Sequence, residues 1–370
     1  MADSELPMRL GTADASSTAL ERLFYPPKPE SWTRRLQLSP LTLLSWPYGL
    51  AVRLRGALYE TGLMRPERVE GLRVISVGNL NVGGTGKTPA VLYLAELLVR
   101  EGRKVGILTR GYGRASTEPR TFTGAVPLPS VQDAGDEPLM LATRCPQVRL
   151  FVGADRVAGA RRARDEFGLD TVLLDDGFQH RRLARDEDVV VMDASVGLGN
   201  GHLLPRGPLR EPASALRRAT LLWVRAAPDG ASPSPRRTQG LPRVVTRYLP
   251  TEVVAPDGVT RPLSWLQGRP VLALAGLARP GGFLRMLASL GADLRDAALF
   301  PDHHAYTESE LRAIHARARQ LGAEVVTTEK DAMRLPSGYS AWVIRLGVEL
   351  LEGESHLRRA LGLAPRPSDL

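Results

Sequence analysis

Residues 73–109 read RVISVGNLNVGGTGKTPAVLYLAELLVREGRKVGILT, and this stretch decides the fold. It opens with a β-branched run at 74–77, as a buried strand does. Glycines interrupt that run, and a proline at position 89 suits the first turn of a helix. The apolar positions within 91–98 then give a wide helical face, and 104–108 is again strand-like. The pattern predicts a strand, a glycine-rich loop, a helix and a second strand, the beginning of an α/β fold.

The glycine-rich loop has the composition of a phosphate-binding loop. Glycine allows backbone N–H groups to turn toward an anion, and the N-terminus of the following helix favours negative charge. Lys87 is expected to reach the β- and γ-phosphates, and the Thr88 hydroxyl is expected to ligate Mg²⁺. We therefore predict that this loop binds ATP through the following residues: Asn81, Val82, Gly83, Gly84, Thr85, Gly86, Lys87 and Thr88.

The loop departs at one position from the general pattern G-x-x-x-x-G-K-[ST], because Asn81 stands where the first glycine is expected. Asparagine tolerates left-handed backbone, so we expect the turn to be kept. The alternative is a glycine-rich turn that only packs a helix on a sheet. The strand-to-helix context favours the phosphate-binding interpretation.

The composition sets broad limits. The chain has 370 residues, 43% of them hydrophobic, so we expect two domains with real cores. The formal charge is +9, but lysine occurs only at Lys28, Lys87, Lys104 and Lys330, so arginine supplies most of the positive charge. Such a bias is weak evidence for a nucleic-acid partner, and we predict none. The single Cys145 excludes a disulfide framework, and the N-terminal residues lack the apolar core of a signal peptide, so we expect a cytoplasmic protein.

An apolar segment, LQLSPLTLLSWPYGLAV, occupies residues 36–52 and has arginines on both sides. Its 17 residues include two prolines, whereas a membrane-spanning helix needs about 20 apolar residues. Trp46 and Tyr48 suit a membrane interface, and the flanking arginines suit anionic headgroups. We expect the segment to lie on, or dip into, the cytoplasmic leaflet of a membrane. A helix packed on the protein's own core explains the same pattern equally well.

Polar residues follow several predicted strands, where ligands of open α/β sheets bind. Asp175 and Asp176 end the strand at 171–174 and are suited to hold Mg²⁺ beside Thr88. Asp136 begins a helix, and either caps it or acts as a general base. We predict further contacts to a phosphorylated or sugar substrate, or only a solvated surface, for a group of mostly basic residues: Arg110, Tyr112, Arg206, Arg210 and Glu211.

A second α/β unit is predicted beyond the Pro/Ser/Gly-rich stretch 227–240. We expect 244–248 and 252–254 to pair as short strands around Pro250 and to join the two units. The second unit contains strand-like runs at 271–275 and 324–327. A loop that includes His303 lies between these two runs. A polar run follows the second one and comprises Thr328, Glu329, Lys330 and Asp331.

The order of the motifs resembles that of the tetraacyldisaccharide 4'-kinases, the kinases of the lipid A pathway. The motifs that carry the resemblance are GNLNVGGTGKTP, TRGYGR, GDEP, LLDDGFQHRRL, LLPRGPLREP, FPDHHAY and TEKDAMR. Asn81 agrees with this family, which has a residue other than glycine there. The resemblance implies an α/β fold with a P-loop NTPase-like core and parallel sheet, a second smaller α/β domain and a short β linker, with ATP between the domains.

The resemblance also implies a function. The γ-phosphate of ATP would be transferred, with Mg²⁺, to the 4'-hydroxyl of a tetraacylated glucosamine disaccharide 1-phosphate, giving lipid IVA at the cytoplasmic face of the bacterial inner membrane. Asp136 would be the general base, His303 would pair with it, and Lys87 would complete the catalytic set. The metal ligands would be Thr88, Asp175, Asp176 and Glu211. Thr328, Lys330 and Asp331 would lie near the nucleotide.

We accordingly divide the chain into an N-terminal arm with a membrane-interface segment (1–68), a kinase core (69–228), a linker (229–262), a second α/β domain (263–350) and a C-terminal tail (351–370). The residues alone leave three other functions open. These are a P-loop partitioning or metal-insertion NTPase, a soluble kinase of a small sugar or nucleoside, and an ATP-gated binding module without activity. Lipid-stimulated formation of a phosphorylated product separates the kinase reading from all three.

Overall fold

The structure is a computed structural model that describes residues 19–26, 30–84, 86–125, 127–227, 230, 238, 240–277 and 280–365. Within these residues, 13 strands form one sheet in the order β11-β10-β12-β13-β8-β7-β6-β1-β5-β2-β4-β3, and β9 pairs with β8. The strands are β1 Arg73–Gly78, β2 Val105–Thr109, β3 Arg120–Phe122, β4 Arg149–Val152, β5 Thr171–Asp175, β6 Glu187–Asp193, β7 Leu221–Arg225, β8 Arg243–Val254, β9 Thr260–Arg261, β10 Pro270–Gly276, β11 Asp293–Phe300, β12 Glu324–Thr328 and β13 Trp342–Glu352.

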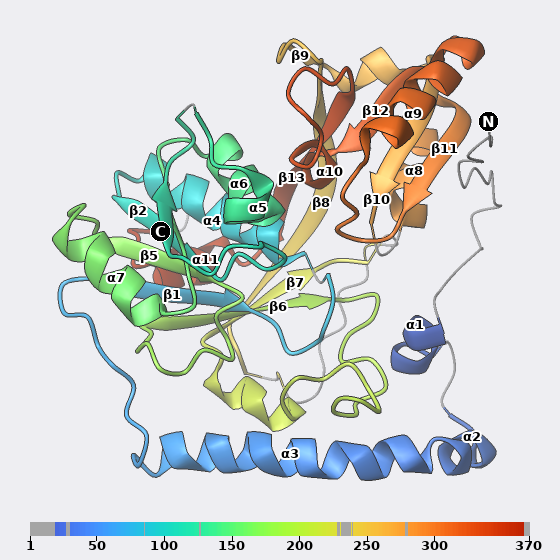
Figure 1. Cartoon of the computed structure of the whole chain (residues 1–370). Helices are drawn as coiled ribbons and strands as arrows, with labels where there is room; N and C mark the ends of the chain where they lie inside the picture. Colours follow the sequence, from blue (N-terminus) through green and yellow to red (C-terminus); the bar gives the residue numbers. More distant parts are fainter. Residues whose placement is uncertain are drawn as a thin grey trace.

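Helices cover this sheet and link its strands (Figure 1). The α-helices are α1 Ala19–Phe24, α2 Trp32–Gln37, α3 Ser39–Glu60, α4 Lys87–Arg100, α5 Val131–Ala134, α6 Asp136–Arg144, α7 Arg156–Asp165, α8 Pro280–Ser289, α9 Glu308–Leu321, α10 Glu329–Ala332 and α11 Glu354–Leu361. The 3-10 helices are η1 Ala213–Arg218 and η3 Leu263–Leu266. The predicted α/β fold with a parallel sheet around the P-loop is confirmed.

The predicted strand–loop–helix–strand unit consists of β1, the loop 79–86, α4 and β2. Strand β1 lies between β5 and β6 and runs parallel to both. Its side chains alternate between two cores, as strand geometry requires: Ile75 and Val77 face α4, whereas Val74 faces α7. Both faces are therefore buried, which explains the near-continuous apolar composition. Helix α4 buries its apolar stripe: Ala90, Val91, Leu92, Leu94, Ala95, Leu97 and Leu98.

The link between the two halves of the sheet differs from our expectation. We predicted that 244–248 and 252–254 pair with each other, but they belong to one strand, β8, which pairs antiparallel with β13 from the end of the chain. The register shifts where Pro250 stands opposite Leu346. An irregularity of this kind tolerates the missing N–H of proline, so the strand continues through it. The same β8 runs parallel to β7 over Arg243–Thr246, so it connects both halves.

The C-terminal residues return to the P-loop half. Residues 351–370, which we predicted to be a tail, include α11, and its side chains Leu357, Ala360 and Leu361 share a core with α4 and β1. Burial of apolar side chains against that core makes this segment part of the kinase half. The division into sequence ranges otherwise remains a prediction, because a single sheet continues through all of them except the N-terminal arm.

Helix α3 lies along the lower edge of the molecule in Figure 1, on the far side from β10–β12. It spans 22 residues with Pro47 inside it, and its buried positions are Ser45 and Gly49. Its opposite side exposes large apolar residues, including Trp46 at 68% and Leu50 at 68%. The structure thus favours a surface segment over a helix buried in the core. Even so, no described helix has the length and hydropathy needed to cross a bilayer.

Candidate active site

The loop between β1 and α4 forms one side of the site. Gly86 precedes α4 with φ +83°, a left-handed value that favours glycine. A Cβ at this position would lie 2.4 Å from Cε2 of Tyr248, whose hydroxyl donates a 2.8 Å hydrogen bond to the Gly86 carbonyl. Lys87 begins the helix, and its Nζ lies 3.3 Å from Asn79 Oδ1 and 3.3 Å from Asp176 Oδ1. Thr85 lies outside the described residues.

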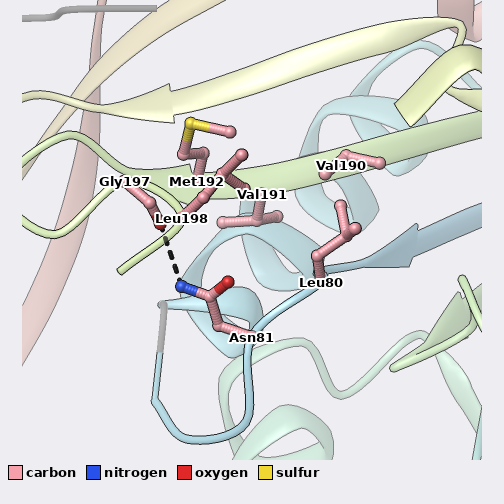
Figure 2. Close-up of a pocket in the computed structure, with 7 residues that line it drawn as sticks. All are labelled: Leu80, Asn81, Val190, Val191, Met192, Gly197 and Leu198. Atoms are coloured by element: carbon pink, nitrogen blue, oxygen red, sulfur yellow. Dashed lines mark hydrogen bonds between the residues drawn. The ribbon is translucent and has the colours of Figure 1, made fainter. Parts of the chain in front are cut away.

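Asn81 has a structural role that explains the departure from the general pattern. Its side chain is 3% exposed and donates a 2.9 Å hydrogen bond to the Gly197 carbonyl. Figure 2 shows this bond at the rim of a small hollow lined by Leu80, Asn81, Val190, Val191, Met192, Gly197 and Leu198. Asn81 also forms a β-bridge with Leu209. Among the described residues other than glycine, only Asp176 and His303 have positive φ, so Asn81 does not adopt the left-handed backbone that asparagine tolerates.

An acidic group faces the loop at the carboxyl end of β5. Asp175 is 4% exposed and accepts a 3.2 Å hydrogen bond from the Thr109 hydroxyl. Burial, with the nearby charges of Glu137 and Asp176, raises the pKa of Asp175 to about 7. Burial also raises the pKa of Asp176, but Lys87 and Arg210 outweigh it, so the net shift is downward. For Asp175, burial and the neighbouring carboxylates thus outweigh the opposing charge of Lys87.

Glu137 belongs to the same group and was missed by the sequence analysis. Burial raises its pKa, while Lys330, Lys87 and His303 act in the opposite direction and Asp136 adds to the rise. Glu137 is therefore close to charged groups from both halves of the sheet. It directly follows Asp136 in the GDEP motif, and this position in the sequence was the signal available for finding it.

The acidic group fits a divalent cation such as Mg²⁺, which would relieve the charge repulsion that raises the pKa of Asp175. Within the described residues, no three His, Cys, Asp or Glu side chains gather closely enough to hold a metal without other ligands. Mg²⁺ needs no such cluster, since it usually takes one or two carboxylates together with waters and substrate phosphates. Thr88, Asp175 and Asp176 remain the predicted ligands on this side of the loop.

Asp136 and His303 meet across the two halves of the sheet. His303 Nδ1 lies 3.1 Å from Asp136 Oδ2, and Arg334 Nε lies 3.4 Å from the same oxygen. Asp136 is 3% exposed, and its other oxygen accepts from the Glu137 amide at 3.0 Å. Lys330 Nζ lies 3.3 Å from His303 Nε2. The predicted pairing of Asp136 with His303 is thus present, and Arg334 is a partner that the sequence analysis missed.

Two other residues of the TEKD run are engaged within the second half. Thr328 caps α10, and its hydroxyl also donates to Asp331 Oδ2 at 2.7 Å. Asp331 is fully buried and accepts from Tyr306 at 2.8 Å and from the Gly276 amide at 2.9 Å. Both side chains hold the short helix α10, which carries Lys330. Contact between them and a nucleotide stays a prediction.

A basic cluster lies beside the acidic group. Arg156 is 8% exposed, and no carboxylate within the described residues forms an ion pair with it. Burial and the charge of Arg110 lower its pKa, and the opposing effects of Asp175 and Asp176 show that it faces them. Burial, Arg156 and other arginines lower the pKa of His180 to about 4. Sequence reasoning found Arg110 but missed Arg156 and His180, although both follow strands at the carboxyl edge.

Two predicted site residues have other partners. Arg206 is 1% exposed, and its guanidinium forms an ion pair with Glu30 of the N-terminal arm instead of facing the site. Both oxygens of Glu211 accept from Arg218, at 2.8 and 3.1 Å, and its role as a metal ligand stays a prediction. Arg210 does reach the site, where its Nη1 lies 2.7 Å from Asp176 Oδ2.

Tyr112 and Arg110 lie at the open side of the site. Tyr112 is 73% exposed, and its ring centroid lies 5.8 Å from that of His303. Arg110 is also exposed. Tyr112 is accessible beside His303, and contact of Tyr112 and Arg110 with a substrate stays a prediction.

Comparison with known proteins identifies the family. The family described as Tetraacyldisaccharide-1-P 4'-kinase, LpxK, matches residues 37–363. The tetraacyldisaccharide 4'-kinase of Anaeromyxobacter sp. (strain K) is 48% identical over 89% of this chain and 92% of its own length. That of Geobacter metallireducens is 43% identical over 81% of this chain and 89% of its own length. The chain belongs to the tetraacyldisaccharide-1-P 4'-kinase family.

A solved structure of the family has the same fold. A crystal structure described as the "apo" form of LpxK from Aquifex aeolicus in complex with ATP matches with a TM-score of 0.74 and 32% identity, over 88% of this chain and 99% of that chain. The resemblance drawn from the motifs is therefore confirmed for the family and for the P-loop fold. In this family member, Glu137 lies close to the P-loop, to the acidic end of β5 and to the Asp136–His303 pair. The charges of Lys87, Asp136 and His303 shift the pKa of Glu137, and the charge of Glu137 raises the pKa of Asp175.

Proposed function

We propose that this protein transfers the γ-phosphoryl group of ATP to the 4'-hydroxyl of a tetraacylated glucosamine disaccharide 1-phosphate, forming lipid IVA. One observation carries the proposal: the Asp136–His303 pair lies near the P-loop. The charges of Asp136, His303 and the P-loop residue Lys87 all act on the pKa of Glu137, so the three groups are close to one carboxyl group. An NTPase that only hydrolyses ATP needs no buried carboxylate paired with a histidine from a second unit. A kinase needs such a base to take a proton from an alcohol.

Phosphoryl transfer depends on in-line placement and on neutralisation of charge at the transferred group. The loop amides, the N-terminus of α4 and Lys87 are suited to hold the β- and γ-phosphates. Mg²⁺ supplies charge neutralisation when it is bound beside Thr88 and Asp175. Asp136 accepts the proton of the attacking hydroxyl as the new P–O bond forms, and His303 holds the carboxylate in place through the 3.1 Å contact. Arg334 Nε, 3.4 Å from the same Asp136 oxygen, adds a second contact that holds the carboxylate in place.

The basic cluster supports an anionic acceptor. Arg156 carries a buried positive charge with no carboxylate partner within the described residues, and an anion would compensate that charge. Arg110 and His180 lie near it. A phosphate at the 1-position of the disaccharide has the required charge. A nucleoside or neutral sugar acceptor would not supply such a charge.

The N-terminal helices support a lipid acceptor at the cytoplasmic leaflet of the inner membrane. Large exposed apolar side chains concentrate in one part of the described chain: Trp32, Leu36, Leu43, Leu44, Trp46, Leu50, Leu54, Leu63 and Met64. The remaining exposed ones are scattered: Tyr112, Leu249, Val259 and Leu351. Arginines border the apolar surface, as anionic headgroups favour. We infer a peripheral or monotopic enzyme whose α3 lies in the interface.

A product assay tests the proposal. The purified full chain is incubated with γ-labelled ATP, Mg²⁺, detergent and the acylated disaccharide 1-phosphate, and the lipids are separated by thin-layer chromatography. We expect label in a bisphosphorylated lipid, and little label with the deacylated disaccharide. Nucleotide hydrolysis without labelled lipid would refute the kinase activity, and equal labelling of the deacylated acceptor would refute the lipid specificity.

A further inference from the structure

Helix α3 has a second side that faces the protein, opposite its exposed apolar side. The Ser45 hydroxyl donates to the Leu203 carbonyl at 3.1 Å and accepts from the Arg206 amide at 3.2 Å. A Cβ at Gly49 would meet the Leu203 side chain at 2.9 Å, so the helix and the loop 203–210 are in close contact. The Tyr48 hydroxyl donates to the Arg210 carbonyl at 2.8 Å. The inner side of α3 therefore holds this loop at several points.

The loop in turn holds the phosphate site. The Arg210 amide donates to the Leu80 carbonyl at 2.7 Å, and the Val82 amide donates to the Pro208 carbonyl at 2.8 Å, so the loop pairs with the start of the P-loop. The Arg210 guanidinium donates to Asp176 at 2.7 Å, and the other oxygen of Asp176 lies 3.3 Å from Lys87 Nζ. Three contacts thus lead from Tyr48 on the surface helix to the lysine of the P-loop.

We propose that Tyr48 is a positioning residue for the kinase reaction: from the membrane-facing helix it fixes the backbone of Arg210, and through Arg210 it sets the arrangement of Asp176 and Lys87. This inference rests on the proposed function. It assigns α3 a role in the active site in addition to a role as an anchor. It also corrects our expectation for Tyr48, which we had assigned to the membrane interface together with Trp46.

The contact suits this role for two reasons. An arginine side chain has many rotamers, and fixing its backbone on one side and Asp176 on the other limits them, which reduces the entropy lost when it binds an anion. Burial raises the pKa of the Tyr48 phenol, so this hydroxyl remains a donor throughout the neutral range. By contrast, Trp46 is 68% exposed on the same helix, so the two nearby aromatic residues separate the two roles.

The test compares Tyr48→Phe with the wild-type full chain in detergent micelles. The variant keeps the ring and loses one hydrogen bond, a loss expected to reduce kcat/KM for the lipid acceptor about fivefold to tenfold. The matched control is Tyr339→Phe, since that hydroxyl also donates to a backbone carbonyl, Leu311, but in the second half. Binding to phosphatidylglycerol vesicles, measured by sedimentation, should be the same for all three proteins.

A second measurement separates positioning from general stability. In an Arg210→Ala background, Tyr48→Phe should have little further effect on kcat/KM, because the side chain through which Tyr48 acts is gone. An unchanged kcat/KM in Tyr48→Phe, an equal loss in both backgrounds, or weaker vesicle binding would each overturn the inference. If the wild-type protein forms no labelled lipid, the proposed function fails instead. Hydrogen exchange then still tests the contact, because amides of 203–210 should exchange faster in Tyr48→Phe.

Discussion

His303 Nδ1 lies 3.1 Å from Asp136 Oδ2, although 167 residues separate the two in the chain. Asp136 begins α6 in the P-loop half, whereas His303 lies in the loop after β11 at the other end of the sheet. The backbone of His303 has φ +60°, an uncommon value for a residue other than glycine. The contact is therefore built by tertiary structure at some conformational cost, as is common where a side chain has a functional task.

Replacing Asp136 with Asn should lower kcat by roughly two to four orders of magnitude, the usual contribution of a general base. ATP binding should persist, because the P-loop does not depend on this carboxylate. Labelled-lipid formation and ATP titration measure the two effects. Asp133→Asn is the matched control, since Asp133 lies in the neighbouring α5 and 40% of its side chain is exposed. A correctly folded Asp136→Asn protein with normal turnover would show that another group takes the proton.

Arg206→Ala should reduce stability and leave the KM for the acceptor unchanged. The pair is almost completely buried, with 2% of the Arg206 side chain and 8% of the Glu30 side chain exposed. Removing one partner leaves a buried charge, which costs about 3–5 kcal/mol. Urea unfolding measures the loss, and an added Glu30→Gln change should recover part of it. A raised KM with an unchanged unfolding midpoint would restore Arg206 to the substrate site.

The apolar side of α3 should be required for binding to a lipid surface. Trp46→Ser and Leu50→Ser each remove an exposed apolar side chain whose burial in a membrane contributes about 1.5–3 kcal/mol. Each change should therefore weaken vesicle binding roughly tenfold or more. Leu249→Ser, at an exposed leucine of β8, is the control and should have no effect. Equal binding by all variants would contradict the interfacial position of α3.

His180 should make the protein less stable in acid. Its pKa is lowered to about 4 in the folded protein, against 6.5 for the free side chain. Between these values the unfolded chain binds a proton that the folded protein does not, so stability falls as the pH decreases from about 6.5 to about 4. Thermal unfolding across this range should show a shallower pH dependence in His180→Gln. His356→Gln, at a histidine of α11, is the control, and an identical slope in His180→Gln would refute the assignment.

Gly86→Ala should distort the phosphate-binding loop. The added Cβ meets the Tyr248 ring at 2.4 Å, and the backbone has φ +83°. Left-handed backbone costs a residue other than glycine about 1–3 kcal/mol, before the steric overlap is counted. Calorimetry should show weaker ATP binding, whereas Gly282→Ala, whose added Cβ meets nothing within 4 Å, should bind ATP normally.

Local pattern was sufficient to predict the strand–loop–helix–strand unit around the P-loop. The β-branched run, the glycines and the apolar spacing of 91–98 each depend on neighbouring residues, so β1, the loop and α4 follow from the sequence. Asp175 and Asp176 could be found because they end a buried strand in the same sheet. The pairing of strands that are distant in the chain could not be predicted from such local patterns. No local signal indicated that β8 pairs with β13 rather than folding on itself.

The partners of charged side chains were also decided by tertiary structure. Arg206 and Arg210 are four positions apart in one loop and looked equivalent, yet one is buried against Glu30 and the other reaches Asp176. Glu211 is held by Arg218, although its position beside Arg210 suggested a metal ligand. Burial and charge balance select each partner, and both depend on segments distant in the chain.

The amino-acid sequence by itself determined the phosphate-binding loop, the acidic strand end and the family, because these are carried by short ordered motifs whose chemistry is local. Only the tertiary structure decided that Asp136 meets His303 beside Glu137, that Arg156 faces Asp175 and Asp176, and that one side of α3 holds the loop of Arg210. The physical reason is that a sheet which runs through both halves brings together side chains whose contacts are set by packing and electrostatics rather than by sequence spacing.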